Sequence, residues 1–184
     1  FVTDLTRAAD AAVLFLDLAD DDGPAATLAV VDRLKQARRE LVAAKGGDDD
    51  PTVYQLPTLL VLNKCDDEAA DIRLEMAKEA IGDRFPTVVA SAERGDALDD
   101  VRKAIYDRLG VMRIYTKQPG KPPDLTSPFT CPHGSTVAEF AGHVHRDFEE
   151  SLKSARVWGS GAFDGQTVGR DHVLKDRDVV ELHV

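Results

Sequence analysis

A short apolar run that ends in polar residues is the part of this sequence best suited to hold a ligand. Residues 59–62 read Leu-Leu-Val-Leu, and Asn63, Lys64 and Asp66 follow directly. Such a run is typical of a strand buried on both faces of a parallel sheet, and ligands bind at the carboxyl ends of those strands. The Asp66 carboxylate can accept two parallel N–H bonds, and Asn63 can both donate and accept, which suits guanine. Alternatively, the same residues form an ordinary turn into a helix.

Two more apolar runs predict the strands that would position this tip. Residues 11–18 and 87–92 are mostly apolar, and helical patterns separate the three runs, so the predicted order is βαβαβα. Right-handed crossovers would make the strands parallel neighbours whose carboxyl ends meet at one edge. Ser91 and Ala92 are therefore expected beside Asn63.

Helical periodicity predicts a helix after each strand. Pro24 is expected in the first turn of the first helix, and Gly82 and Gly110 are expected to end the second and third. Residues 1–9 are also compatible with a helix, and because the chain opens with Phe1 we interpret the sequence as a fragment. The predicted buried stripes are Val30, Leu34, Ala37 and Leu41, then Ile72, Met76 and Ala80, then Leu98, Val101, Ile105 and Leu109.

The two predicted strand tips together resemble the guanine-recognition half of P-loop GTPases of the translation-factor class. The residues that carry the resemblance are Asn63-Lys64-Cys65-Asp66, Ser91-Ala92, Gly95, Leu98 and Asp99. The resemblance implies that Asp66 accepts from guanine N1–H and N2–H₂ and that Asn63 holds the base and the neighbouring loops. It further implies that the stem of Lys64 lies over the purine, that the N–H of Ala92 binds O6, and that Ser91 braces the loop.

The phosphate-binding half of such a domain is not found in the sequence. No G-x-x-x-x-G-K-[ST] occurs, so GTP or GDP with Mg²⁺ is expected in an intact parent and not on this chain. Asp20-Asp21-Asp22-Gly23 matches the D-x-x-G motif of this family. The family places a helix, a strand and another helix between that motif and Asn-Lys-x-Asp, whereas residues 24–57 predict only one helix and a loop before Asn63. We interpret this acidic stretch as a solvated loop rather than a magnesium site.

Composition limits the class of protein and its surroundings. The 184 residues are 43% hydrophobic and 30% charged, as in soluble globular proteins, and no apolar run is long enough to cross a membrane. We therefore expect a cytoplasmic protein without membrane contact. The net charge of −10 argues against broad binding to nucleic acid phosphates. Residues 111–184 hold nine basic and ten acidic side chains, so residues 1–110 carry −9. This asymmetry suggests two domains, 1–110 and 111–184.

The second half predicts a small α+β module. Strands are expected at 112–116, 127–131, 155–159 and 179–184, and Thr136 and Glu139 predict a capping box. The capping box opens a helix whose buried face is Val137, Phe140, Ala141, Val144 and Phe148. Trp158 is interpreted as a core residue, and the five histidines, without cysteine partners, predict no metal site.

Several ordered motifs in this module look like a TGS domain of β-grasp, or ubiquitin-like, fold. They are 113–117, 132–137, 156–159 and 168–180, and they resemble the version in developmentally regulated GTP-binding proteins, relatives of the Obg GTPases. The resemblance implies a ribosome- or RNA-associated role in translation, with the TGS domain as docking element. The candidate RNA contacts are Arg113, Lys117, Lys121, Arg156 and Arg170, although basic side chains are usually just solvated.

The sequence thus predicts an α/β fold, the parallel-stranded half of a truncated Ras-like P-loop GTPase, followed by an α+β TGS domain. The parent would hydrolyse GTP, whereas this chain is expected to be inactive, to bind guanine nucleotide weakly and to self-associate through the exposed strand at 13–18. A second hypothesis is a nucleotide-independent module that binds protein or RNA. A third is an enzyme that uses Asp17 to Asp22 as a magnesium site.

Overall fold

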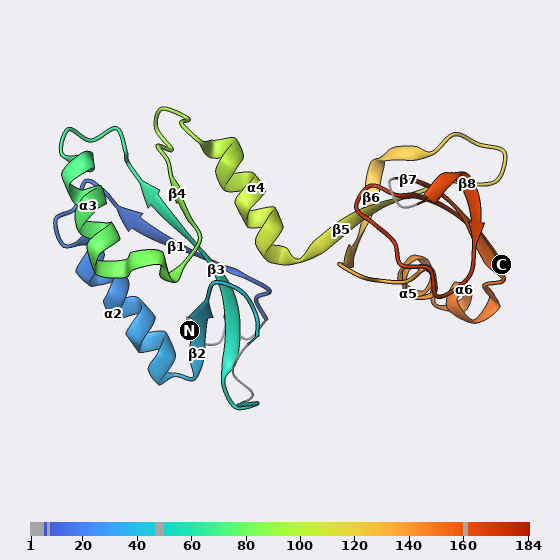
Figure 1. Ribbon diagram of the computed structural model, residues 1–184, viewed down its shortest axis with the longest axis horizontal. Helices are drawn as coiled ribbons and strands as arrows, with labels where there is room; N and C mark the ends of the chain where they lie inside the picture. The colour runs from blue at the N-terminus through green and yellow to red at the C-terminus, as the bar shows by residue number, and fades with distance from the viewer. Residues whose placement is uncertain (1–5, 7, 47–49, 160–161) are drawn as a thin grey trace. The chain divides into compact units, whose positions relative to one another are not determined.

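The chain folds into two compact units, Phe1–Leu109 and Gly110–Val184. The computed structural model describes residues 6, 8–46, 50–159 and 162–184 (Figure 1). The helix-compatible segment at 1–9 lies largely outside the described residues. No helix within the described ranges is both long and apolar enough to cross a bilayer.

The first unit is built around one central strand, β3 (Tyr54–Asn63). Strand β1 (Ala12–Asp17) pairs with residues 58–63 of β3, and β4 (Thr87–Val89) pairs with residues 60–62 on its other edge. A short strand, β2 (Arg39–Val42), pairs with residues 54–57. All three pairings are parallel, so the predicted parallel sheet is confirmed and its carboxyl ends lie at one edge.

Helices cover both faces of this sheet. Leu60 and Leu62 face a core formed with α2 (Gly23–Gln36) and α3 (Ala70–Ile81), and a 3₁₀ turn, η1 (Gly82–Arg84), follows α3. Leu59 and Val61 face the opposite way, toward α4 (Leu98–Leu109). Because successive side chains of a strand alternate between faces, an unbroken apolar run is what a strand between two helical layers requires. The layers are visible in Figure 1.

The first predicted helix is shorter than expected, because a strand follows it. Helix α2 ends at Gln36, and Arg38 adopts a positive φ of 57°, which turns the chain out of the helix and into β2. Leu41, predicted on the helix, is buried in β2 instead. Of the stripe predicted for α2, Leu34 is buried as expected, whereas Val31 is buried in place of Val30, which is 47% exposed, and Ala37 is exposed.

The predicted buried stripe of the second helix is wrong. Ile72 is 69% exposed and Met76 is 46% exposed, and Ala80 is exposed as well. The face of α3 against the sheet consists of Ala70, Ala77 and Ile81. Two apolar stripes therefore coexist on this helix, and periodicity alone does not show which one meets the core.

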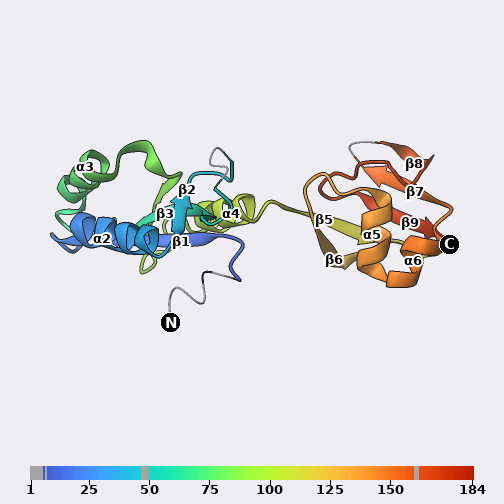
Figure 2. The same ribbon diagram turned by 90° about the horizontal axis from the view of Figure 1, so that it is seen from below.

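The second unit is a five-stranded sheet with two short helices on one side. The strand order is β6-β5-β9-β7-β8, with α5 and α6 packed together (Figure 2). Residues of α5 and of the inner sheet face, among them Phe140, Met112 and Val157, form the core. The elements are β5 (Val111–Thr116), β6 (Asp124–Pro132), α5 (Val137–Val144), α6 (Arg146–Ser151), β7 (Ser154–Gly159), β8 (Ala162–Val168) and β9 (Val179–His183).

Local details of this unit both agree with the sequence and depart from it. The capping box of Thr136 and Glu139 is confirmed. The single predicted helix is divided, because His145 is extended and its ring accepts the N–H of Asp147 to cap α6. Strand β8 was not predicted, because its sequence mixes polar and apolar residues without a strand pattern. It is an edge strand, and among the described strands it pairs only with β7. Trp158 is half-buried on the opposite sheet face from the core residue Val157, so its prediction as a core residue is wrong.

We predict self-association through the open edge of β1. Among the described residues β1 pairs with β3 alone, and Phe15 on it is 62% exposed, so its backbone can pair with another copy. Sedimentation velocity at increasing concentration should show dimers that Phe15→Lys weakens. Val173→Lys, at another exposed apolar position in the second unit, is the control. A monodisperse monomer at high concentration would contradict the prediction.

Candidate functional site

Backbone and side-chain hydrogen bonds tie together the ends of three strands at the polar tip of β3. The N–H of Ala92 donates to Asn63 Oδ1 at 3.1 Å, and the N–H of Cys65 donates to the carbonyl of Ala90 at 3.2 Å. On the other side, the N–H of Leu18 donates to the carbonyl of Asn63 at 2.9 Å. The structure thus brings the predicted residues of two separate loops into one small site.

Asp66 presents a carboxylate that is held ionised. Ser91, which is buried, hydrogen-bonds to it, and this bond is the main reason that the pKa of Asp66 is lowered. The Oδ1 atom of Asp66 is nevertheless buried and has no hydrogen-bond partner among the described residues. A buried acceptor without a donor is costly, so this atom is suited to a ligand N–H.

Lys64 is fixed by an ion pair that the sequence did not indicate. Its backbone has a positive φ of 64°, and its Nζ lies 2.6 Å from Asp17 Oδ2 at the end of β1. The hydrogen bond from Lys64 is the main reason that the pKa of Asp17 is lowered. Both side chains are substantially exposed, so the pair orients Lys64 more than it stabilises the fold.

Arg73 of α3 connects the loop after β1 to the loop after β3. Its Nε lies 2.7 Å from Asp21 Oδ1, and its Nη1 lies 2.7 Å from Asp67 Oδ1. The same Nη1 donates to the carbonyl of Leu18 at 3.1 Å. The Arg73 side chain is 16% exposed, so it acts as a partly buried bridge between the loops. Sequence reasoning missed Arg73, because its partner Asp21 lies 52 positions away along the chain.

Replacing Arg73 by Ala should loosen the loops at the tip of β3. Because three hydrogen bonds from one planar group are lost, we expect a destabilisation of about 1–2 kcal/mol. Amide hydrogen exchange at residues 63–67 should accelerate in the variant. Arg102→Ala, which removes an exposed ion pair on α4, is the matched control. Equal exchange rates in both variants would show that Arg73 does not hold the loop.

The tip of β3 offers a carboxylate and a backbone N–H, which are groups that a guanine edge can bind, whereas phosphates and magnesium need groups of other kinds. The sequence contains no Gly-rich phosphate loop, and the described residues contain no cluster of three or more His, Cys, Asp or Glu side chains arranged for a metal. Two carboxylates of the acidic stretch, Asp17 and Asp21, are paired with Lys64 and Arg73.

The predicted RNA contacts of the second unit engage different partners. Lys117 forms an ion pair with Glu181 and lies 4.9 Å above the ring of Trp158, and Arg156 lies 6.0 Å from the same ring. Arg156 is opposite Glu181 in the β7–β9 register, so these side chains share the outer face of the sheet. Elsewhere, Arg113 is paired with Asp176, Lys121 is exposed in a loop, and Arg170 donates to the carbonyl of Leu152.

The Glu181 pair should make the second unit sensitive to acid. Glu181 is 4% exposed, and the hydrogen bond from Lys117 is the main cause of its lowered pKa. A lowered folded-state pKa stabilises the fold above the unfolded value of 4.5, and this contribution disappears as the pH falls through the folded-state pKa. Glu181→Gln should therefore destabilise the unit near neutral pH and little at low pH, as followed by Trp158 fluorescence during urea unfolding. A stability difference that does not depend on pH would contradict this.

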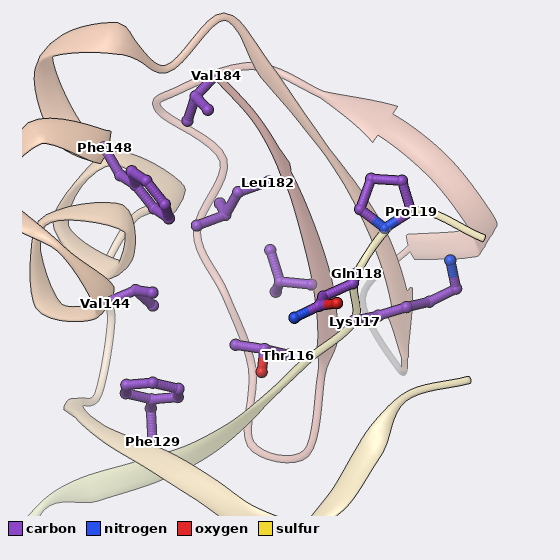
Figure 3. A pocket seen from close by; sticks show the side chains of 10 residues that line it. Thr116, Lys117, Gln118, Pro119, Phe129, Val144, Phe148, Leu182 and Val184 are labelled. Carbon is purple, nitrogen blue, oxygen red and sulfur yellow. The ribbon is translucent and has the colours of Figure 1, made fainter. Parts of the chain in front are cut away.

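A cavity of about 310 Å³ lies between the helices and the sheet of the second unit. Its walls are largely apolar, with Phe129, Val144, Phe148 and Leu182 around it, and Gln118 turns its amide toward the space (Figure 3). Lys117 contributes its stem, while its ammonium points away. None of the sequence motifs predicted this cavity, because its lining comes from several elements.

The fold and the site define a class of protein: a GTPase-like α/β unit followed by a TGS domain. Residues 112–184 match the TGS domain family. Over 130 residues, 69% of the chain, the sequence is 38% identical to developmentally-regulated GTP-binding protein 1 of Xenopus laevis and 35% identical to an uncharacterized GTP-binding protein of Methanocaldococcus jannaschii. It is 33% identical to ribosome-interacting GTPase 1 of Saccharomyces cerevisiae over the same share. The predicted resemblance to developmentally regulated GTP-binding proteins is confirmed.

These relatives are longer than the chain. The matched region covers 34% of the Xenopus and Saccharomyces proteins and 33% of the Methanocaldococcus protein, so the chain spans about a third of their length. The structure of the Schizosaccharomyces pombe YchF GTPase superposes with a TM-score of 0.53 over 86% of this chain and 53% of its own, at 13% identity. That similarity supports the fold alone.

Proposed function

We propose that the tip of β3 and the loop at Ser91 and Ala92 select the guanine base of GTP or GDP. Asp66 accepts the N1–H and N2–H₂ groups of guanine, and Asn63 holds the base and the neighbouring loop. The stem of Lys64 covers the purine face, and the N–H of Ala92 binds O6. The names of the relatives, which describe GTP-binding proteins, support this assignment.

The buried, unpartnered Oδ1 of Asp66, beside the bonded pair of Asn63 and Ala92, is the observation that carries the proposal. In the proposal, a heterocycle edge with two N–H donors supplies the hydrogen bonds that this carboxylate can accept. GTP hydrolysis would require phosphate-binding residues that this sequence lacks, so we assign base selection to the chain and place catalysis in a longer protein.

Titration of the ¹⁵N-labelled chain with GMP and AMP tests base selection. Without a phosphate cradle we expect a dissociation constant near the millimolar range, about −4 kcal/mol. GMP should shift the amides of residues 63–66 and 91–92, whereas AMP, whose purine edge has no N1–H, should not. Equal shifts with both nucleotides would refute base selection and favour the nucleotide-independent module.

We further propose that the TGS domain docks to RNA on the cytoplasmic ribosome. The name of the yeast relative, a ribosome-interacting GTPase, and the cations Lys117 and Arg156 beside Trp158 support this second function. An aromatic ring flanked by cations can contact both bases and phosphates of single-stranded RNA.

Fluorescence anisotropy with a labelled single-stranded RNA at two salt concentrations tests this docking. Arg156→Glu and Trp158→Ala should each weaken binding by roughly tenfold, and the effect of Arg156→Glu should shrink at high salt. Arg102→Glu, on α4 of the first unit, is the charge-matched control. If it weakens binding as much as Arg156→Glu, the loss is due to the added negative charge of the whole chain and not to this surface.

A further inference from the structure

Helix α3 carries an apolar stripe that the fold does not use. Ile72, Met76 and Ala80 recur every four residues and are exposed, with exposed fractions of 69% for Ile72 and 46% for Met76. The core contact of the same helix is made by Ala70, Ala77 and Ile81. Large apolar side chains held in water on a regular helical spacing are characteristic of a binding face.

The position of α3 keeps this stripe away from the open edge of the sheet. Residues 60–62 of β3 pair with β1 on one edge and with β4 on the other. Helix α3 connects β3 to β4 and lies beside α2 on the same sheet face (Figure 1).

The charges around the stripe are predominantly negative. Glu68, Asp71 and Glu79 are exposed and form no ion pair with another described residue. Both cations of the helix are already engaged, because Lys78 pairs with Glu75 at 2.7 Å and Arg73 pairs with Asp21 and Asp67. On a helical projection Glu79 lies directly beside the apolar stripe and Asp71 lies farther round on the same side, and Glu68 stands in the turn just before the helix. The face is thus apolar along its centre and acidic along one border.

We propose that this face of α3 docks a basic amphipathic helix from a protein partner. The apolar side of the partner helix lies on Ile72 and Met76, and its Lys or Arg side chains meet Glu68, Asp71 and Glu79. The flexible thioether of Met76 adapts to side chains of different shape. The contact resembles other helix-on-surface interactions, in which apolar anchors provide affinity and border charges provide orientation. None of the residues of this surface belongs to the proposed guanine site.

Binding of a designed peptide tests the proposal. The probe is a helical peptide of about 18 residues with Leu on one face and Lys on the other, and the control probe has the same composition in scrambled order. In a titration of the ¹⁵N-labelled chain, the ordered peptide should shift the amides of residues 68–80. It should bind at least about tenfold more tightly than the scrambled peptide, because only the ordered peptide presents an apolar face.

Variants of the chain separate the apolar and the electrostatic contributions. The double variant Ile72→Ser/Met76→Ser should lose about tenfold or more in affinity, and Glu68→Gln/Glu79→Gln should lose less and mainly at low salt. Leu125→Ser/Val173→Ser, which removes two exposed apolar side chains of the second unit, is the matched control and should bind normally. Because all these positions are exposed, the thermal unfolding midpoint should stay unchanged in each variant.

Three outcomes would overturn the proposal. The first is an equal affinity of the ordered and scrambled peptides, which would indicate attraction by net charge alone. The second is normal peptide binding by Ile72→Ser/Met76→Ser, or peptide-induced shifts confined to another surface such as β1. The third is a dimer of the free chain that Ile72→Ser/Met76→Ser converts to monomer, since the occupant of the face would then be a second copy.

Discussion

Replacing Asp66 by Asn is expected to change the preference of the chain from GMP to XMP. Xanthine has a carbonyl where guanine has its N2–H₂ group, so it needs a donor at the position where Asp66 offers only an acceptor. The amide of Asn supplies that donor and keeps the size of the side chain. Each mismatched pair leaves a buried polar group unsatisfied, and we expect the GMP-to-XMP affinity ratio to change by roughly 100-fold or more.

Changes in the amide chemical shifts of residues 63–66 and 91–92 measure the binding of GMP and of XMP at millimolar nucleotide concentration. Asp66→Ala should bind neither base selectively, which distinguishes an exchanged hydrogen bond from a general loss of the site. Asp100→Asn, on the exposed first turn of α4, is the control for the change in net charge. If Asp66→Asn prefers GMP as strongly as the parent chain, Asp66 does not read the base.

Gly159→Ala is expected to cause the largest loss of stability in the second unit. A Cβ atom on Gly159 would lie 1.9 Å from Oδ1 and 2.9 Å from Cγ of Asp178, a residue that is fully buried and whose pKa burial raises. Because Asp178 is buried and its Oδ2 accepts the N–H of Lys175 at 2.8 Å, moving the carboxylate aside would disturb this hydrogen bond, and we expect a destabilisation of about 3 kcal/mol. Urea unfolding followed by the fluorescence of Trp158, the single tryptophan of the chain, measures this unit specifically.

A double-mutant cycle identifies the cause of that loss. Asp178→Ala removes both clashing carboxyl atoms, so Gly159→Ala should cost below about 1 kcal/mol in that background. Gly169→Ala is the control, because a Cβ atom there meets nothing within 4 Å. An equal cost of Gly159→Ala with and without Asp178 would mean that the clash with these carboxyl atoms is not the cause, since the lower unfolded-chain entropy of Ala by itself favours the folded state.

The parts of the fold that follow from apolar run length were predictable. Residues 59–62 are apolar at every position because β3 is covered by helices on both faces, and this signal located the sheet and its polar tip. The meeting of Asn63 with Ala92 followed from the handedness of the crossover. The capping box at Thr136 could be predicted from the sequence because its hydrogen bonds join residues only three positions apart.

The errors arise where tertiary context decides between local alternatives. Leu41 fits the helical period of α2, but the positive φ at Arg38 ends the helix first. On α3 the small residues Ala70 and Ala77 face the sheet because they allow close approach, whereas the larger Ile72 and Met76 remain outside. The ion pairs of Arg73 and Lys64 link residues 52 and 47 positions away along the chain, which no local pattern encodes.

The hydrogen bond between Asn63 Oδ1 and the N–H of Ala92 gives the site an internal competitor for its ligand. The same N–H is the donor that guanine O6 would use, so the Asn63 side chain acts as a built-in substitute for the base. This keeps the two loops aligned while no nucleotide is present and limits the entropy lost on binding. The exchange of one acceptor for another would also lower the net gain from O6, so under the proposed function discrimination between bases would fall mainly to Asp66.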